Sequence, residues 1–176
     1  MTRLLLIGIG LVLASCALSD QDLLAGPNAF QYLPEGRPVD IPPALAKLEP
    51  DNYFHAFGYD LVLPGRRAAF RAGGPQPTFF SIYPGPDIRL VRLKRGDDHD
   101  DRNLKVVKGR KGTSLVPMIP SDVMVELEVS REGDGLYRVT PRGPLPPGEY
   151  AFMSRVDAER WDKYPSKARL YPFGVD

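Results

Sequence analysis

Proline and glycine restrict the secondary structure of this chain more than any other residues. They number 19 and 17 among 176 residues, and the prolines recur from Pro27 to Pro172. A proline inside a helix removes a backbone hydrogen bond and clashes with the preceding turn, whereas both residues are common in turns. We therefore expect many short segments joined by turns, and not a bundle of long helices.

The segments between these turns have the residue patterns of strands. Ile88 to Leu93 interleaves apolar residues with arginines, which predicts a strand with one wet face. Val123 to Val129 and Leu136 to Thr140 flank Glu132 to Gly135, a loop whose glycines allow the positive φ of a tight hairpin. Further candidate strands lie at 53–63, 68–71, 78–83, 104–107, 114–119, 151–154 and 170–175. Pro172 lacks a backbone donor, so the last of these is expected at a sheet edge.

Of these ten candidates we expect about seven to nine to be strands. Short strands with turns at regular spacing favour an all-β fold built from antiparallel sheets. The stretch from Leu145 to Tyr150 resembles a corner of immunoglobulin-like and fibronectin-type sandwiches, where a leucine, a proline-glycine turn and a tyrosine hold the crossing between sheets. The resemblance assigns structural roles to Leu145, Gly148 and Tyr150, and implies that the tyrosine hydroxyl bonds to backbone a few residues upstream. We therefore expect an immunoglobulin-like β-sandwich.

Composition divides the chain into three parts. Residues 1–15 are predicted to be a signal peptide, residues 16–51 a proline-rich tether, and residues 52–176 the β-sandwich domain. Proline-rich segments are extended, at about 3 Å per residue, so the tether can hold a domain away from a membrane. Within it, Pro43 to Glu49 is expected to form one or two helical turns. An alternative is that the apolar residues of the tether pack on the domain: Phe30, Tyr32 and Leu33.

The N-terminus has the pattern of a secretory signal peptide. Arg3 gives a short positive region, Leu4 to Leu13 is an apolar run, and Ala14 and Ser15 are small. The apolar run is too short to cross a hydrocarbon core as a helix, which requires roughly 20 residues. The residue that follows Ser15 is Cys16, the only cysteine in the chain.

Leu13-Ala14-Ser15-Cys16 resembles the lipobox of bacterial lipoproteins, in which a branched apolar residue and two small residues precede a cysteine. The resemblance implies a diacylglyceryl group on the Cys16 sulfur, cleavage between Ser15 and Cys16, and acylation of the new N-terminus. A thiolate is nucleophilic enough for such alkylation, and two or three chains are needed because one chain holds only marginally. Ala17 in place of aspartate favours the outer membrane, facing the periplasm, or the outer leaflet of the plasma membrane in a Gram-positive source.

The charge of the chain is close to neutral. Formal charge is +1, and loss of Arg3 with the leader brings the mature chain to 0. Such a chain has no strong field to attract nucleic acid, and we expect no nucleic-acid partner. With the only cysteine lipidated, an intramolecular disulfide is excluded, so stability must come from the core.

The densest group of potential metal ligands is an acidic run before a predicted strand: Asp97, Asp98, His99, Asp100 and Asp101. Carboxylate oxygens are suitable ligands for Ca²⁺, but the run lacks the alternation, turn glycine and distal glutamate of an EF-hand loop. A solvated acidic loop is the favoured interpretation, with a Ca²⁺ site as the alternative. We expect no resident cofactor.

A basic run follows the acidic one: Lys105, Lys108, Arg110 and Lys111. The two runs are expected to neutralise each other across a hairpin. The alternative is contact of the basic run with lipid phosphates or a peptidoglycan carboxylate, at about 1 kcal/mol for each basic residue near an anionic surface.

The sequence contains no hydrolase or phosphate-loop motif. Its two histidines, His55 and His99, lie in an aromatic-rich run and in the acidic run. We therefore expect a non-enzymatic lipoprotein, held to the bilayer by acyl chains, that binds another envelope protein. The alternative is a small periplasmic enzyme or metal-binding protein that uses the loop from Asp97 to Asp101.

Overall fold

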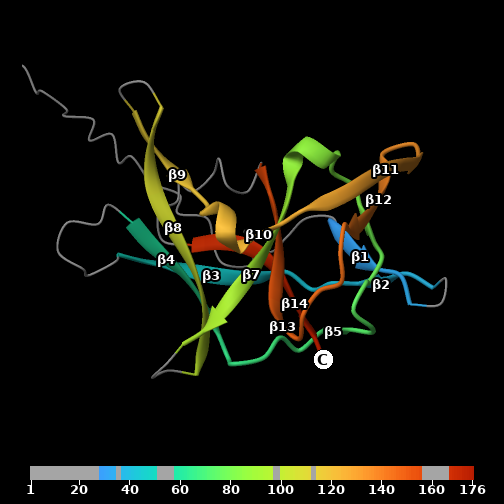
Figure 1. The fold of residues 1–176 in the computed structure, drawn as a ribbon, viewed down its shortest axis with the longest axis horizontal. Coiled ribbons are helices and arrows are strands. Elements are labelled where there is room, and N and C mark those ends of the chain that lie inside the picture. The colour runs from blue at the N-terminus through green and yellow to red at the C-terminus, as the bar shows by residue number, and fades with distance from the viewer. Residues whose placement is uncertain (1–27, 35–36, 51–57, 97–99, 112–113, 156–166) are drawn as a thin grey trace, which may run out of the picture.

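The computed structural model describes residues 28–34, 37–50, 58–96, 100–111, 114–155 and 167–176 (Figure 1). Side chains are described for all of these except residues 50, 58–59 and 107–117. The strands are β1 (Phe30–Tyr32), β2 (Val39–Asp40), β3 (Ala44–Pro50), β4 (Gly58–Pro64), β5 (Arg71–Ala72), β6 (Phe79–Ser81), β7 (Ile88–Arg95), β8 (Asp101–Lys111), β9 (Ser114–Met118), β10 (Met124–Val125), β11 (Leu127–Gly133), β12 (Leu136–Pro141), β13 (Gly148–Ser154) and β14 (Lys167–Val175). Two 3-10 turns are η1 (Gly85–Asp87) and η2 (Ser121–Val123).

The prediction of an all-β fold with antiparallel sheets is confirmed. Among the described strands, all pairings are antiparallel except that of β5 with β14. Two sheets are present, and the five-stranded one has the order β11-β12-β6-β1-β2. It lies to the right in Figure 1, beside the larger sheet.

The larger sheet closes into a six-stranded barrel, whereas the predicted sandwich would have two open sheets. Its strands follow the order β7-β13-β14-β3-β4-β8, and the ring is completed where β8 returns to β7. This closing contact is short, because only Lys94↔Asn103 and Arg95↔Arg102 are paired. Further along β7, the partner on that side is β10, paired through Met124↔Val91 and Val125↔Leu90. Closure removes sheet edges that would otherwise stay unpaired.

Small and branched apolar side chains fill the barrel. The cluster draws on each of the six barrel strands: Ala46, Leu61, Leu63, Val91, Leu93, Leu104, Val106, Ala151, Met153, Ala168 and Leu170. Ile119 and Val123, on the segment from β9 to β10, pack against the same cluster. Because successive side chains of a strand point to opposite faces, their neighbours point out of the barrel.

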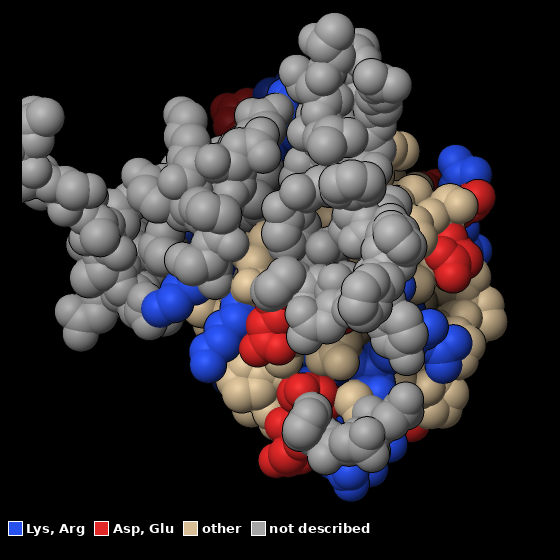
Figure 2. All heavy atoms as spheres, turned by 90° about the vertical axis from the view of Figure 1, so that its left-hand side faces the viewer, with Lys and Arg blue, Asp and Glu red and all other residues tan. Residues whose placement is uncertain are grey.

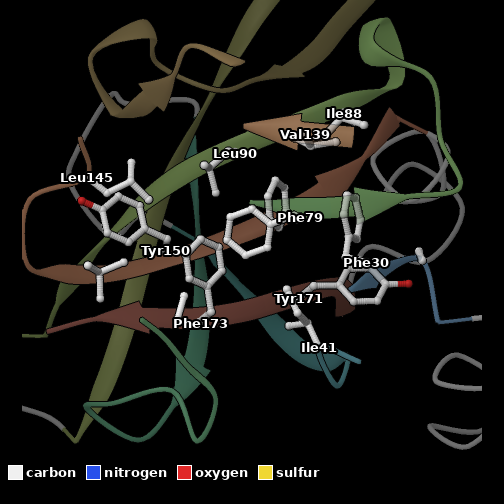
Figure 3. Packing of buried hydrophobic residues seen from close by; sticks show 14 residues of the cluster. Phe30, Ile41, Phe79, Ile88, Leu90, Val139, Leu145, Tyr150, Tyr171 and Phe173 are labelled. Atoms are coloured by element: carbon white, nitrogen blue, oxygen red, sulfur yellow. The ribbon is translucent and has the colours of Figure 1, made fainter. Parts of the chain in front are cut away.

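A second core fills the space between the barrel and the five-stranded sheet (Figure 3). Phe30 of β1 stacks on Phe152 of β13 with ring centroids 4.6 Å apart. Phe79 of β6 lies edge-on to Phe152 at 4.9 Å and tilted to Phe173 of β14, also at 4.9 Å. Strand β13 is therefore buried on both faces, with Ala151 and Met153 in the barrel. This explains why its sequence reads as a continuous apolar run instead of an alternating one.

The hairpin predicted across Glu132 to Gly135 is confirmed. Strands β11 and β12 pair from Leu127↔Pro141 to Gly133↔Leu136, and Gly135 has a φ of 71°. This φ lies in the left-handed region that glycine adopts without steric cost.

The structure places β1, β2 and β3 within residues 16–51, for which the sequence predicted a tether. Phe30, Ile41 and Ala46 have no exposed surface, so this stretch contributes to both cores. The helical turns expected from Pro43 to Glu49 are replaced by β3, which lies between β14 and β4. Pairing on both edges and burial of Ala46 outweigh the weak local preference.

The prediction that the final strand lies at a sheet edge is wrong. β14 pairs with β13 along one side, and on the other with β3 at Lys167–Leu170 and with β5 at Gly174–Val175. Pro172 lies between the part of β14 that pairs with β3 and the part that pairs with β5. On that side of β14, the described pairings give Pro172 no partner. A proline is therefore tolerated inside a central strand.

Candidate functional site

A hollow of about 910 Å³ lies at the end of the barrel where β7 ends and β13 begins. We call it the basic hollow, since five basic and three acidic residues are among its lining. The basic residues are Arg67, Arg71, Arg92, Lys94 and Arg95, and the acidic ones are Asp122, Glu149 and Asp176. Its volume is within the usual range of ligand-binding pockets, about 300 to 1,000 Å³.

Glu149 is the buried carboxylate in the lining of the hollow. It is 1 % exposed, and its place on β13 sets it on the barrel side of the strand, with Ala151 and Met153. Its Oε2 accepts from the backbone N–H of Ala68 at 2.6 Å and from Nη1 of Arg102 at 3.5 Å. Its Oε1 accepts from Nη1 of Arg71 at 2.6 Å. Both oxygens are thus held, as a buried carboxylate requires.

Arg71 connects this buried carboxylate to the surface. Its Nη2 donates to Oδ1 of Asp176 at 2.5 Å and its Nε donates to Oδ2 at 3.2 Å, which is a bidentate pair. The hydrogen bonds to Asp176, with the one to Glu149, raise the pKa of Arg71, although its partial burial acts in the opposite direction. Hydrogen bonding to Arg71 lowers the pKa of Asp176.

Arg102 of β8 lies at the short contact between β7 and β8 that closes the barrel. Its Nε donates to the carbonyl of Gly65 at 2.8 Å and its Nη2 to that of Pro64 at 3.1 Å. Its side chain is 5 % exposed, and this burial lowers the pKa of Arg102. The guanidinium therefore satisfies two carbonyls at the end of β4 and supplies part of the countercharge for Glu149.

Four other cations line the hollow without making ion pairs of this kind to described residues. The side chains of Arg67, Arg92, Lys94 and Arg95 are exposed and form no hydrogen bond or ion pair with the part of the chain that the structure describes. Arg71 already binds both Glu149 and Asp176. Among the described residues, the lining therefore has an excess of positive charge, carried by side chains that are exposed and can contact an anion.

The residues of the predicted lipobox, Leu13, Ala14, Ser15 and Cys16, lie outside the described residues, as do Asp97, Asp98 and His99. Asp100 is exposed, and its Oδ1 accepts from the backbone N–H of Arg66 at 3.2 Å. Asp101 is the first residue of β8. Among the residues described, no group of three or more potential ligands is arranged to hold a metal ion.

The residues of the predicted corner lie next to the basic hollow. Leu145 is 4 % exposed and Tyr150 is 1 % exposed, both in the core between the two sheets. The Tyr150 hydroxyl donates to the carbonyl of Pro146 at 2.7 Å. Burial raises the pKa of Tyr150. Gly148 begins β13 and lines the hollow.

The predicted basic run lies on β8, where Lys105 is exposed and the side chains of Lys108, Arg110 and Lys111 are outside the description. On the face drawn in Figure 2, basic and acidic side chains are interspersed over the visible part. Neither sign forms a continuous patch there.

Sequence reasoning did not identify the residues of the basic hollow. Arg92 lies in the strand predicted from Ile88 to Leu93, where it has the appearance of an ordinary wet face. Lys94 and Arg95 lie beyond that predicted range, in the part of β7 that the sequence did not predict. Arg71 and Glu149 are 78 positions apart, and nothing local connects them. The available signal was a glutamate at the start of an otherwise apolar strand, where a buried carboxylate needs a cationic partner.

No family model, no curated protein and no solved structure matches this chain. Within the described residues, no helix has the length and apolar character needed to cross a membrane. The fold and the site thus define the protein in structural terms: an antiparallel six-stranded barrel, covered on one side by a five-stranded sheet, with a basic hollow at one end.

Proposed function

We propose that this protein is a lipid-anchored lipoprotein of the bacterial cell envelope that binds an anionic component of that envelope in its basic hollow. It acts by binding and not by catalysis. The lipobox resemblance of Leu13 to Cys16 supports the anchor, and Ala17 supports an outer-membrane location facing the periplasm. The observation that carries the binding role is that four cations of the hollow form no hydrogen bond or ion pair with the described part of the chain.

The chemistry of the lining favours binding over catalysis. Arginine keeps its proton at all physiological pH values and presents a planar set of donors that suits carboxylate and phosphate groups. It is therefore an anion ligand and a poor proton donor or acceptor. The buried carboxylate, Glu149, is held by Arg71, Arg102 and the Ala68 N–H, so it is occupied by structural contacts.

We also propose that Leu145, Gly148 and Tyr150 form the same kind of corner as in immunoglobulin-like sandwiches. The hydrogen bond from Tyr150 to the carbonyl of Pro146, four positions upstream, supports this role. The corner would fix the entry of β13, and with it the position of Glu149, one residue before Tyr150.

Calorimetric titration with pyrophosphate tests the binding role. The full-length lipidated protein is kept in solution by a non-ionic amphipol, and the small polyanion is added at low and at high salt. We expect saturable binding that weakens several-fold as salt rises, because the site is exposed to screening. Arg92→Gln should weaken it about tenfold, which corresponds to about 1.4 kcal/mol.

The matched control is Arg131→Gln, on the hairpin of β11 and β12, where Arg131 is exposed and pairs with Asp134. This variant should bind pyrophosphate like the wild type. Equal affinities for the wild type, Arg92→Gln and Arg131→Gln, or no saturable heat, would refute binding in the hollow.

A further inference from the structure

The basic hollow continues into two smaller recesses beside β7. The first, of about 400 Å³, shares Arg92, Asp122 and Val123 with the hollow. The second, of about 470 Å³, shares Met124, Val125 and Arg142 with the first. We call these two recesses together the trough. Shared lining residues therefore connect the hollow and the trough into one depression.

The trough differs from the hollow in its chemistry. In the first recess two basic and two acidic residues balance, and Arg142 is already paired with Glu126 at 3.5 Å. Apolar groups make up much of the rest of its lining: Val123, Met124, Val125, Pro144, Leu145 and Pro146. Met124 is 40 % exposed and so adds accessible apolar surface to this lining.

We propose that the hollow and the trough together bind an amphiphile with a phosphate head group and an apolar chain. This inference rests on the proposed function, since the head would occupy the basic hollow. Positive charge is concentrated at one end of the depression, and exposed apolar surface follows it. A compact anion would contact only the basic hollow, whereas an anion with an apolar chain would contact both the hollow and the trough.

Phosphate suits the head better than carboxylate. A phosphate monoester has three free acceptor oxygens and close to two negative charges at neutral pH. The donors of Arg67, Arg92, Lys94 and Arg95 have no hydrogen-bond partner among the described residues, and together they exceed what one carboxylate can engage. An anchor in the bilayer would also keep the depression close to a source of such amphiphiles.

An acyl chain suits the trough better than an extended peptide. An extended peptide that adds a strand to a free sheet edge gains its affinity from main-chain hydrogen bonds. Here β10 covers the edge of β7 through Met124↔Val91 and Val125↔Leu90. Among the described strands β10 ends this sheet, but it is only two residues long and offers few backbone groups to a peptide. A hydrocarbon chain needs no hydrogen bonds, and each methylene that it buries contributes up to about 0.8 kcal/mol.

Methionine methyl NMR can test this directly, because the chain carries its own probes. Met124 lines the trough, while Met153 is buried in the barrel and Met118 is exposed on β9. The lipidated full-length protein, with ¹³C-methyl methionine and a non-ionic amphipol, is titrated with octyl phosphate, methyl phosphate, nonanoate and octyl glucoside. Octyl phosphate should shift the Met124 methyl in a saturable way and leave Met153 unmoved.

The affinity for octyl phosphate should exceed that for methyl phosphate by at least tenfold. Arg92→Gln should weaken both, whereas Met124→Gln, followed by calorimetry, should weaken octyl phosphate alone. Binding of methyl phosphate with no gain from the chain would overturn this inference and leave the proposed function intact. Binding of neither phosphate would contradict both.

Three other results would also overturn the inference. Equal affinity for nonanoate would remove the preference for phosphate. Equal affinity for octyl glucoside, unaffected by Arg92→Gln, would mean apolar adsorption only. A Met124 shift caused by a heptapeptide with a free C-terminal carboxylate, and not by octyl phosphate, would assign the depression to a peptide.

Discussion

The side chain of Arg71 lies across Gly174, in the space that a side chain at position 174 would occupy. A Cβ on Gly174 would be 1.5 Å from Nη1 of Arg71 and 2.0 Å from its Cζ. From this position Arg71 reaches both Glu149 and Asp176, at 2.6 and 2.5 Å. The absence of a side chain on β14 thus allows one arginine to link a buried carboxylate to the rim of the basic hollow.

Gly174→Ala is expected to displace Arg71 and destabilise the fold by about 2 kcal/mol, because Glu149 loses a charged partner while remaining buried. Urea unfolding followed by circular dichroism measures the change. Gly143→Ala is the matched control, since no atom lies within 4 Å of its Cβ position. A loss in the control as large as that in Gly174→Ala would contradict the assignment.

Glu149→Gln should cost about 3 to 5 kcal/mol, because it leaves the buried guanidinium of Arg102 without its countercharge. Thermal or urea unfolding at neutral pH provides the value. The comparison variant is Glu126→Gln, which breaks an ion pair with side chains 80 % and 66 % exposed. Exposed pairs are worth about 0 to 1 kcal/mol. Similar losses in the two variants would show that Glu149 is not the central partner.

Tyr150→Phe removes the hydroxyl that donates to the Pro146 carbonyl. We expect a loss of about 1 kcal/mol in the free energy of unfolding, since the ring stays packed and only the hydrogen bond is lost. Tyr137→Phe, at a partly exposed position of β12, should change stability by less than half as much. An unchanged stability of Tyr150→Phe would mean that the corner does not depend on this bond.

The carboxyl of Asp176 should titrate below its ordinary pKa of about 3.9, because Arg71 hydrogen-bonds to the charged form. A carboxyl whose pKa is lowered by folding stabilises the fold above its ordinary pKa, and this contribution is lost as pH falls through the lowered value. The destabilisation caused by Asp176→Asn should therefore be present at neutral pH and disappear in strong acid. Carboxyl ¹³C NMR gives the pKa, and a normal value would contradict the pairing.

Local signals allowed much of the strand content to be predicted. The hairpin of β11 and β12 follows from glycines between two apolar runs, and β7 from its mixture of apolar and charged residues. The resemblance to a lipobox is also local, since four adjacent residues carry it, and it stays a prediction. Each of these features needs no knowledge of distant parts of the chain.

The barrel and its hollow could not be predicted in the same way. Closure depends on two residue pairs between β7 and β8, and nothing in either strand specifies that partner. Phe30 looked like part of a tether because prolines surround it, although it stacks on Phe152, which lies far along the chain. Arg71 and Glu149 are likewise brought together only by the completed fold.

Arginine side-chain NMR during a pyrophosphate titration tests the central claim most directly. We predict that the Nε resonances of Arg67, Arg92 and Arg95 shift together with one dissociation constant, because these guanidinium groups face the same hollow. The signals of Arg131 and Arg138, on the five-stranded sheet, should not move. Equal shifts in both sets, or none in the first, would contradict an anion-binding hollow at the end of the barrel.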